Sequence, residues 1–207
     1  MTNNYSIIYS TKLDKKTNRF VKRAFDVLFS SVVLICVFPI VFLVLFVCIK
    51  LSMPGPVFFK QKRTGKNGKT FICYKFRTMK INSDADIVQA VNGDPRITAL
   101  GRFLRLTSVD ELPQFWNVLK GDMSVIGPRP HMLAHTKEFS ELIDNYDLRH
   151  RIKPGITGWA QINGYRGEVT FDKMKKRVEF DLFYINNWSL KLDFIIILRT
   201  FKIIFSR

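Results

Sequence analysis

The sequence predicts an α+β fold with a membrane-attached N-terminal part, and three observations support this. Positions 27–49 form a run of 23 residues without a charged side chain. Two segments rich in β-branched and aromatic residues follow, joined by the glycine-containing turn TGKNGK. From position 84 onward the pattern is mostly helical and is interrupted by glycine and proline clusters. A small β-hairpin beside several helices is therefore expected.

Charge is distributed unevenly along the chain of 207 residues. The sequence has 33 basic and 17 acidic side chains, and 47% of its residues are hydrophobic, which excludes intrinsic disorder and allows one domain. Residues 1–80 hold 15 basic and 2 acidic side chains, whereas residues 81–207 hold 18 and 15. Because the excess lies at one end, a local anionic partner is expected there, rather than a uniformly basic coat for nucleic acid.

The uncharged run at 27–49 is long enough to cross a membrane. As a straight helix it measures about 34 Å, against about 30 Å for a bilayer core. Pro39 lies near its middle, removes one backbone N–H and clashes with the carbonyl of Ile35. Because basic residues prefer the cytoplasmic side, their presence on both flanks favours a segment that enters the membrane and returns. These flanking residues are Lys12, Lys15, Lys16, Arg19, Lys22 and Arg23 before the run, and Lys50, Lys60, Lys62, Arg63 and Lys66 after it.

We therefore predict four regions. Residues 1–24 form a basic tail and the start of a membrane-entry helix, and residues 25–51 form a re-entrant membrane helix broken at Pro39. Residues 52–193 form a small cytoplasmic domain, and residues 194–207 form an amphipathic helix in the membrane interface. A kinked spanning helix and a buried core helix are the alternatives for 25–51.

The β-hairpin and the C-terminal helix are predicted from different patterns. Residues 57–63 and 70–77 are expected as the two strands. In the C-terminal helix the basic residues fall on one face and the apolar residues largely opposite, which fits an interfacial helix or one packed on the domain. Tyr184 and Trp188, just before this helix, are expected at the level of the lipid headgroups.

The cysteines and histidines do not predict a metal site. Cys36, Cys48 and Cys73 lack metal or disulfide spacing and are expected as small buried side chains. His131 and His135 are four residues apart, a spacing that can bind zinc, but no third ligand and no H-E-x-x-H glutamate accompanies them. A surface helix is the expected context of both histidines.

The stretch TSVDELPQFWNVLKGDMSVIGPRP has the most specific arrangement of charged residues. Pro113 must lie near the start of a helix, where its missing N–H has no helical partner. With Asp110 as the N-cap, Pro113 takes the third helical position and Gly121 ends the helix. Ser108 as the N-cap would form a capping box with Glu111 but would place Pro113 one position too deep.

This placement predicts phosphate chemistry. A carboxylate at a helix N-terminus stays ionised beside N–H groups that attract phosphate oxygens. Asp110 can then act as a nucleophile toward phosphorus, and Asp110 and Glu111 can hold Mg²⁺, the cation that usually accompanies phosphate substrates. Arg129, mounted between Pro128 and Pro130, suits a bidentate phosphate contact. An ordinary helix cap is the alternative for the Asp-Glu pair.

Several ordered blocks extend from near Arg19 to the C-terminus. After the apolar run come PGPVFFKQKRTG (54–65), KFRTM (75–79), GDPRIT (93–98), TSVDELPQ, NVLKGDMSVIGPRP, KPGITGWAQINGYRG (153–167) and YINNWSLKLD (184–193). Through these blocks the sequence resembles the monotopic phosphoglycosyl transferases, the bacterial sugar transferase family. It is most similar to members that transfer glucose-1-phosphate to undecaprenyl phosphate, partly through GPRPHMLAH. Those members commonly have further N-terminal regions, so the chain is expected to represent their catalytic portion.

The resemblance implies a two-step transfer at the cytoplasmic face of the bacterial inner membrane. Asp110 would attack the β-phosphorus of a UDP-sugar, with UDP-glucose as one candidate, and release UMP; undecaprenyl phosphate would then accept the sugar phosphate. Glu111 matches the partner carboxylate, and Mg²⁺ is required. The family also implies a re-entrant helix with both ends cytoplasmic. Some members have Ser-Pro at its break, where this chain has Phe38-Pro39.

Five basic residues are expected to bind the substrate phosphates. Arg105 and Arg129 match positions associated with phosphate binding in the family, and Lys75, Arg77 and Arg96 lie in the shared blocks. A homo-oligomer is compatible with the sequence, which does not specify one.

A different class of function also fits the basic N-terminal part. A non-catalytic membrane-surface protein would bind anionic lipid or acidic polymer through such a region. It would need the basic flanks but not the Asp110-Glu111 pair with its Pro-Arg-Pro segment. No nucleic-acid partner is expected, because many of the aromatic residues lie in apolar runs instead of alternating with basic residues on an exposed face.

Overall fold

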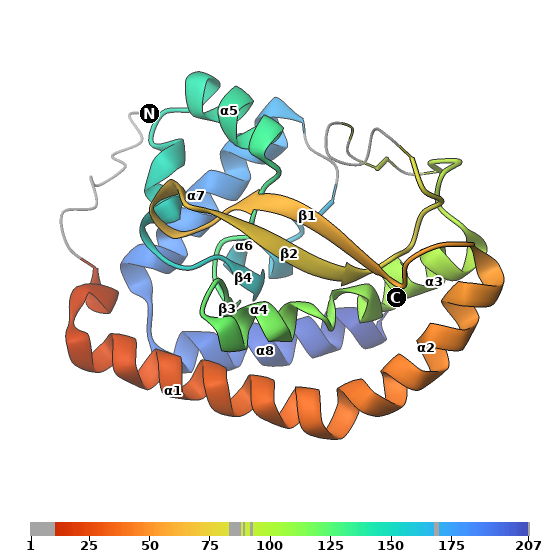
Figure 1. Ribbon diagram of the computed structural model, residues 1–207. Coiled ribbons are helices and arrows are strands. Elements are labelled where there is room, and N and C mark those ends of the chain that lie inside the picture. The colour runs from red at the N-terminus through yellow and green to blue at the C-terminus, as the bar shows by residue number, and fades with distance from the viewer. Residues whose placement is uncertain (1–10, 83–87, 89, 92, 168–169, 207) are drawn as a thin grey trace.

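The computed structural model describes residues 11–82, 88, 90–91, 93–167 and 170–206. In this part of the chain the predicted α+β fold is confirmed, with helices arranged around two small sheets (Figure 1). Residues 1–10 of the predicted basic tail and residue 207 of the predicted C-terminal helix lie outside the described residues.

The described elements are short except for the helices at both ends. The strands are β1 (Phe58–Thr64), β2 (Thr70–Phe76), β3 (Ser124–Ile126) and β4 (Gly155–Thr157). The α-helices are α1 (Lys16–Val32), α2 (Phe38–Ser52), α3 (Ala99–Thr107), α4 (Gln114–Lys120), α5 (Leu133–Leu142), α6 (Trp159–Ile162), α7 (Phe171–Asn187) and α8 (Leu190–Phe205). A π-helical turn covers Val33–Val37, and 3-10 turns cover Lys12–Asp14, Lys66–Gly68, Val109–Glu111 and Tyr146–Arg151.

The predicted β-hairpin is confirmed. β1 and β2 pair antiparallel, with Phe58 opposite Phe76 and Thr64 opposite Thr70. In the turn, Asn67 has a positive φ of 55°, a conformation that asparagine tolerates better than most residues. The hairpin crosses the front of the domain in Figure 1, with α4 and α8 behind and below it.

The second sheet is not predicted by the sequence. β3 and β4 pair in parallel, with Ser124 opposite Gly155. Strands of three residues are too short to show an alternating pattern, so the sequence indicates only chain breaks here. The segment after β3 approaches the start of β4 so closely that only glycine fits there. A Cβ atom at Gly155 would collide with the backbone of Gly127.

Two hydrophobic clusters pack the domain onto the N-terminal helix. The larger cluster joins α4, β3, α7 and α8, and Phe25 and Phe29 of α1 pack against it. The smaller cluster joins Leu45 and Ile49 of α2 to the hairpin and to Leu104 of α3. Both halves of the N-terminal helix therefore contact the same domain.

The uncharged run lies in one continuous helix, Lys16–Ser52, of 37 residues. Within the described residues it is the one helix that is long and apolar enough to cross a membrane. In its π-helical turn the N–H of Phe38 bonds to the carbonyl of Val33. Pro39 follows directly, and because it has no N–H it interrupts the α-helical hydrogen-bond pattern. The helix bends at this turn, and its two arms diverge instead of folding back on each other (Figure 1).

One side of this helix is apolar and accessible. Leu28, Val32, Ile35, Ile40 and Leu43 have exposed fractions between 61% and 74%. A continuous apolar surface of this kind is typical of a protein or membrane contact.

Two of the flanking basic residues of α1 are directed into the domain. Lys22 is 7% exposed, and its Nζ lies 2.9 Å from Oδ2 of Asp193 on α8. Arg23 donates from Nη1 and Nη2 to the carbonyls of Val118 and Leu119, at 2.6 and 2.8 Å, in the last turn of α4. Both residues therefore contact the domain, a role that the sequence did not predict. They dock the helix because buried partners satisfy their charges.

Asp193 holds several elements together. Besides Lys22, its carboxylate accepts from the hydroxyl of Tyr184 at 2.7 Å and from Nε1 of Trp188 at 3.1 Å. Tyr184 and Trp188 are 1% and 4% exposed, so the prediction that they lie among lipid headgroups is wrong. Because their polar atoms donate to the buried carboxylate of Asp193, their rings can be buried in the core without an unsatisfied donor.

The helix α8 begins earlier than predicted and packs on the domain with one of its faces. Ser189 caps it by accepting from the N–H of Leu192 at 3.2 Å, so the helix starts at Leu190 instead of Phe194. Ile196 is fully buried against the domain. Other apolar residues of the same helix are exposed, namely Phe194, Leu198, Phe201 and Phe205.

Replacing Asp193 by Asn is expected to lower the free energy of unfolding by about 3–5 kcal/mol, because Lys22 would keep a buried charge without its counterion. Denaturation in a mild detergent, followed by circular dichroism, measures the change. Asp172→Asn, an exposed position in the first turn of α7, is the matched control and is expected to change stability little. Equal stabilities of the two variants would contradict the role given to Asp193.

Candidate active site

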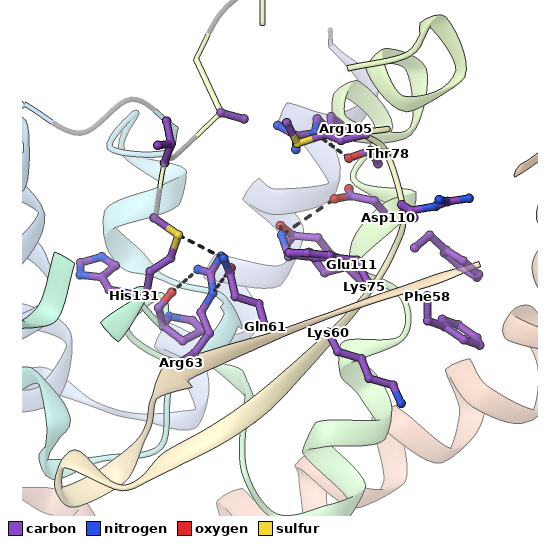
Figure 2. Close-up of a pocket in the computed structure, with 18 of the residues that line it drawn as sticks. Phe58, Lys60, Gln61, Arg63, Lys75, Thr78, Arg105, Asp110, Glu111 and His131 are labelled. Atoms are coloured by element: carbon purple, nitrogen blue, oxygen red, sulfur yellow. Dashed lines mark hydrogen bonds and ion pairs between the residues drawn. The ribbon is translucent and has the colours of Figure 1, made fainter. Parts of the chain in front are cut away.

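A cavity of about 730 Å³ lies beside the hairpin. This is within the usual size range of small-molecule sites. Its lining combines carboxylates with a larger number of basic residues. Figure 2 shows Asp110, Glu111, Lys75 and Arg105 grouped together, with His131 toward the other end of the view. The charged lining residues are Lys60, Arg63, Lys75, Arg77, Lys80, Arg105, Asp110, Glu111, Arg129, Arg166 and Arg177.

Asp110 and Glu111 are presented by a 3-10 turn, not by the start of an α-helix. Bonds from Glu111 N–H to the carbonyl of Ser108 and from Leu112 N–H to that of Val109 define this turn. The predicted N-cap at Asp110 is wrong, because α4 begins at Gln114 and Pro113 is its N-cap. At that position the missing proline N–H has no helical role.

The predicted end of this helix is confirmed. Gly121 follows Lys120 with a φ of 90°, and its N–H bonds to the carbonyls of Asn117 and Val118. Glycine adopts this left-handed conformation without the penalty of a Cβ atom.

Glu111 is buried among cations from three separate segments. Arg129 donates to both carboxylate oxygens, Lys75 Nζ lies 2.9 Å from Oε1, and Arg166 Nη2 lies 3.5 Å from the same oxygen. Burial alone would favour the neutral acid, but Arg129, Lys75 and Arg166 outweigh it and hold the pKa of Glu111 well below its usual value. Glu111 is therefore a fixed negative charge.

Asp110 is buried with fewer partners. It is 5% exposed, the nearest ion-pair distance is 3.9 Å, from Oδ2 to Lys75 Nζ, and Oδ1 has no hydrogen-bond partner. Burial and the neighbouring charge of Glu111 raise the pKa of Asp110, while Lys75, Arg105 and Arg166 oppose the rise. The prediction that an α-helix N-terminus keeps Asp110 ionised is therefore wrong, and the nearby cations only partly offset the effect of burial.

Three of the five predicted phosphate-binding residues lie close to the carboxylates. Lys75 and Arg129 contact Glu111, and Arg105 donates from Nε to Oγ1 of Thr78 at 2.9 Å while lining the same cavity. The bidentate geometry predicted for Arg129 is present, but its acceptor is Glu111. A phosphate would therefore share this guanidinium with the carboxylate.

The other two predicted residues have structural partners. Arg77 lines the cavity but donates to the carbonyls of Met53 and Pro54, at 2.8 and 2.7 Å, where α2 leads into the hairpin. Arg96 is paired with Asp94 at 2.7 Å and is not among the residues that line the cavity. Its hydrogen bonds lower the pKa of Asp94 to about 2. A direct phosphate contact of Arg96 therefore stays a prediction, for a residue that already has a carboxylate partner.

The sequence did not single out the arginines that support the site. Arg166 follows α6 and reaches Glu111 from a distant part of the chain. Arg149 is 1% exposed, pairs with Asp181 at 2.7 Å and donates from Nη2 to the carbonyl of Arg129 at 2.8 Å. Both arginines belong to glycine-rich or irregular stretches, where no periodicity relates them to the carboxylates.

His131 belongs to this buried support and not to a surface helix. Its Nδ1 lies 2.6 Å from both the Tyr146 hydroxyl and Nη1 of Arg149. Because arginine can only donate, Nδ1 is an acceptor and the ring is neutral; burial, Arg149 and Arg177 lower the pKa of His131 well below its usual value. The expected helical context is wrong for His131, which precedes α5.

The carboxylate pair offers a limited set of metal ligands. Among the described residues no group of three or more His, Cys, Asp or Glu side chains is positioned for a metal ion. Asp110 Oδ1 is unpartnered, whereas both oxygens of Glu111 accept from cations. Mg²⁺ usually takes one or two carboxylates together with substrate phosphates and water. These residues therefore fit an Mg²⁺ ion that enters with a diphosphate.

Comparison with known proteins identifies a family to which this chain is similar. The model of the bacterial sugar transferase family matches residues 17–207. The chain is 51% identical over 198 residues to the UDP-glucose:undecaprenyl-phosphate glucose-1-phosphate transferase of Escherichia coli (strain K12), covering 94% of this chain and 42% of that protein.

Two further relatives differ in name and in length. Identity is 44% over 189 residues to the UDP-N-acetylgalactosamine-undecaprenyl-phosphate N-acetylgalactosaminephosphotransferase of Aeromonas hydrophila, covering 90% of this chain and 44% of that protein. It is 46% over 185 residues to the exopolysaccharide production protein PSS of Rhizobium leguminosarum bv. phaseoli, covering 86% of this chain and 92% of that protein. The chain thus spans less than half the length of the first two relatives and most of the third.

Proposed function

Because the chain belongs to the bacterial sugar transferase family, we propose that it transfers a sugar-1-phosphate from a UDP-sugar to undecaprenyl phosphate and releases UMP. The names of the Escherichia coli and Aeromonas hydrophila relatives support this reaction class. They name different sugars, so UDP-glucose is a first candidate and not an assignment. The name of the Rhizobium relative supports a place early in exopolysaccharide assembly.

The unpartnered oxygen of Asp110 is the observation that carries the proposed mechanism. Oδ1 is buried, has no hydrogen-bond partner and belongs to a residue that lines the cavity. A carboxylate oxygen stripped of water and of donors is a reactive nucleophile once it is ionised. Glu111 cannot take this role, because cations already occupy both of its oxygens.

The transfer proceeds in two balanced displacements. In the first, an oxygen of Asp110 forms a bond to the β-phosphorus of the UDP-sugar, and the bond from this phosphorus to the bridging oxygen breaks, so that UMP leaves with the electron pair. In the second, a phosphate oxygen of undecaprenyl phosphate attacks the same phosphorus and displaces the carboxylate of Asp110. The product is an undecaprenyl diphosphate sugar, and the enzyme returns to its starting form.

The basic residues around Asp110 stabilise the charge of the substrates. Lys75 and Arg105 line the same cavity as Asp110, and their charges favour its ionised form. Arg129, already oriented by Glu111, offers its guanidinium to the phosphates. A bound Mg²⁺ ion would be held by Asp110 and Glu111 together with the diphosphate, and it would supply additional neutralisation of the charge on the leaving phosphate.

The helix Lys16–Ser52 is proposed to enter the cytoplasmic face of the bacterial inner membrane and to return. Its first half packs on the larger hydrophobic cluster and its second half on the smaller one, both in the same domain. A straight spanning helix would leave one end on the opposite side of the membrane, away from that domain. The bend at Val33–Val37 and the exposed apolar side support entry without crossing.

The non-catalytic alternative has less support. Lys12, Lys15, Lys16 and Arg19 are exposed and could contact anionic lipid, so this part of the chain fits either function. A lipid-binding protein gives no reason, however, to bury Asp110 and Glu111, a costly arrangement that a phosphate-transfer site explains.

Replacing Asp110 by Asn is expected to abolish UMP release while membrane attachment is retained, because the amide lacks the nucleophilic oxygen but has nearly the same shape. UMP release is measured with UDP-glucose and undecaprenyl phosphate in detergent, and then with a panel of UDP-hexoses. Asp144→Asn, an exposed position after α5, is the control and should keep full activity. Undiminished turnover by Asp110→Asn would reject the nucleophile. Absence of UMP release by the parent protein with every sugar would favour the non-catalytic alternative.

Removal of Mg²⁺ with EDTA is expected to stop UMP release. Without the ion, the negative charge of the diphosphate would face the carboxylates of Asp110 and Glu111 with less neutralisation. Addition of excess Mg²⁺ should restore the rate. Full activity in EDTA would contradict the requirement for a divalent cation.

Single cysteines placed before and after the membrane helix are expected to react with an impermeant thiol reagent from the cytoplasmic side alone. Positions 12 and 60 are both exposed and suit this test in a background without the native cysteines. Inverted membrane vesicles and intact spheroplasts distinguish the two faces. Labelling of position 12 from the outer face would identify a spanning helix.

A further inference from the structure

Ser108 connects the two segments that carry the reactive part of the site. It ends α3, which carries Arg105, and it begins the 3-10 turn that carries Asp110 and Glu111. Its φ is 61°, in the left-handed region that residues with a Cβ atom rarely adopt. Such strain persists where the surrounding structure imposes it, and it is often found at functional sites.

The side chain of Ser108 has a specific partner. Arg166 Nη1 donates to Oγ of Ser108 at 2.9 Å, although 58 positions separate the two residues. Nη2 of the same guanidinium lies 3.5 Å from Oε1 of Glu111. Arg166 thus bridges both ends of one short turn, and it also lines the cavity.

We propose that Ser108 is a positioning residue, whose hydroxyl orients Arg166 toward Glu111 and the phosphate-binding part of the cavity. This inference rests on the proposed function. One nitrogen of the planar guanidinium is held by Ser108, so the other nitrogen faces the carboxylate in a defined direction. Without the hydroxyl, Nη1 loses this contact, and the direction of the partly exposed guanidinium is less restricted. Ser108 touches no substrate in this scheme and acts through Arg166.

Ser108→Gly separates this role from a purely structural one. Glycine adopts the positive φ without strain, so the variant should be at least as stable as the parent protein. It lacks the hydroxyl, however, and kcat for UMP release from UDP-glucose should fall by about ten- to a hundredfold, the equivalent of one hydrogen bond to a charged group. KM for UDP-glucose should change much less than kcat, if Arg166 acts mainly on the transition state.

A double-mutant cycle tests whether Ser108 acts through Arg166. Arg166→Met removes the guanidinium, and the double variant should be no slower than Arg166→Met alone. Asn145→Gly is the matched control, because it relieves another positive φ, of 63°, at a residue that does not line the cavity. It should leave kcat unchanged.

The outcomes separate this inference from the proposed function. If the parent protein releases UMP and Ser108→Gly does so at the same kcat, the positioning role is wrong and the proposed function stands. Losses that multiply in the double variant would also overturn the role, because they indicate independent effects. If the parent protein releases no UMP from any UDP-hexose, the proposed function fails, and the positioning role fails with it.

Discussion

The buried negative charge of Glu111 is the interaction on which the rest of the site depends. A carboxylate removed from water must be matched by nearby cations, and here Lys75 comes from the hairpin, Arg129 from the segment before α5, and Arg166 from the loop after α6. These three segments are far apart in sequence and meet at one side chain. Their meeting creates the cation-lined cavity, and Asp110, the adjacent residue, enters it with a free oxygen. The two carboxylates consequently have different electrostatic environments, one fixed as an anion and one made reactive by burial.

A second set of buried contacts holds these cations in position from behind. Arg149 joins Asp181 of α7 to His131 and to the backbone carbonyl of Arg129, so the orientation of the Pro-Arg-Pro segment depends on α7. On the other side of the domain, Asp193 joins α1 to α8 through Lys22. The same type of interaction, a buried carboxylate with matched donors, therefore builds the cavity and attaches the apolar helix to the domain. This arrangement gives a reason why a chain with so many basic residues places several of its few carboxylates in the interior.

Much of the local structure could be predicted from the sequence, and the failures share a cause. The hairpin and the helix end at Gly121 follow from short-range patterns and are confirmed. The strands β3 and β4 were missed because each is three residues long and depends on a distant partner. Tyr184 and Trp188 were placed among lipid headgroups because an amphipathic ring suits an interface, but a single buried carboxylate satisfies both polar groups in the core. Neither pattern nor spacing predicts that Arg96 is paired with Asp94, because that contact depends on the local fold of the GDPRIT segment.

By itself, the sequence determined that an uncharged segment with a central proline is flanked by basic residues, and that two adjacent carboxylates lie among arginines. These are properties of composition and of neighbours in the chain, which hydropathy and residue chemistry report directly. Only the tertiary structure decided which arginines contact Glu111, which basic flanking residues are buried, and that Asp110 occupies a 3-10 turn with a raised pKa. Those outcomes depend on burial and on contacts between distant segments, because desolvation and charge pairing are set by three-dimensional distance, whatever the separation along the chain.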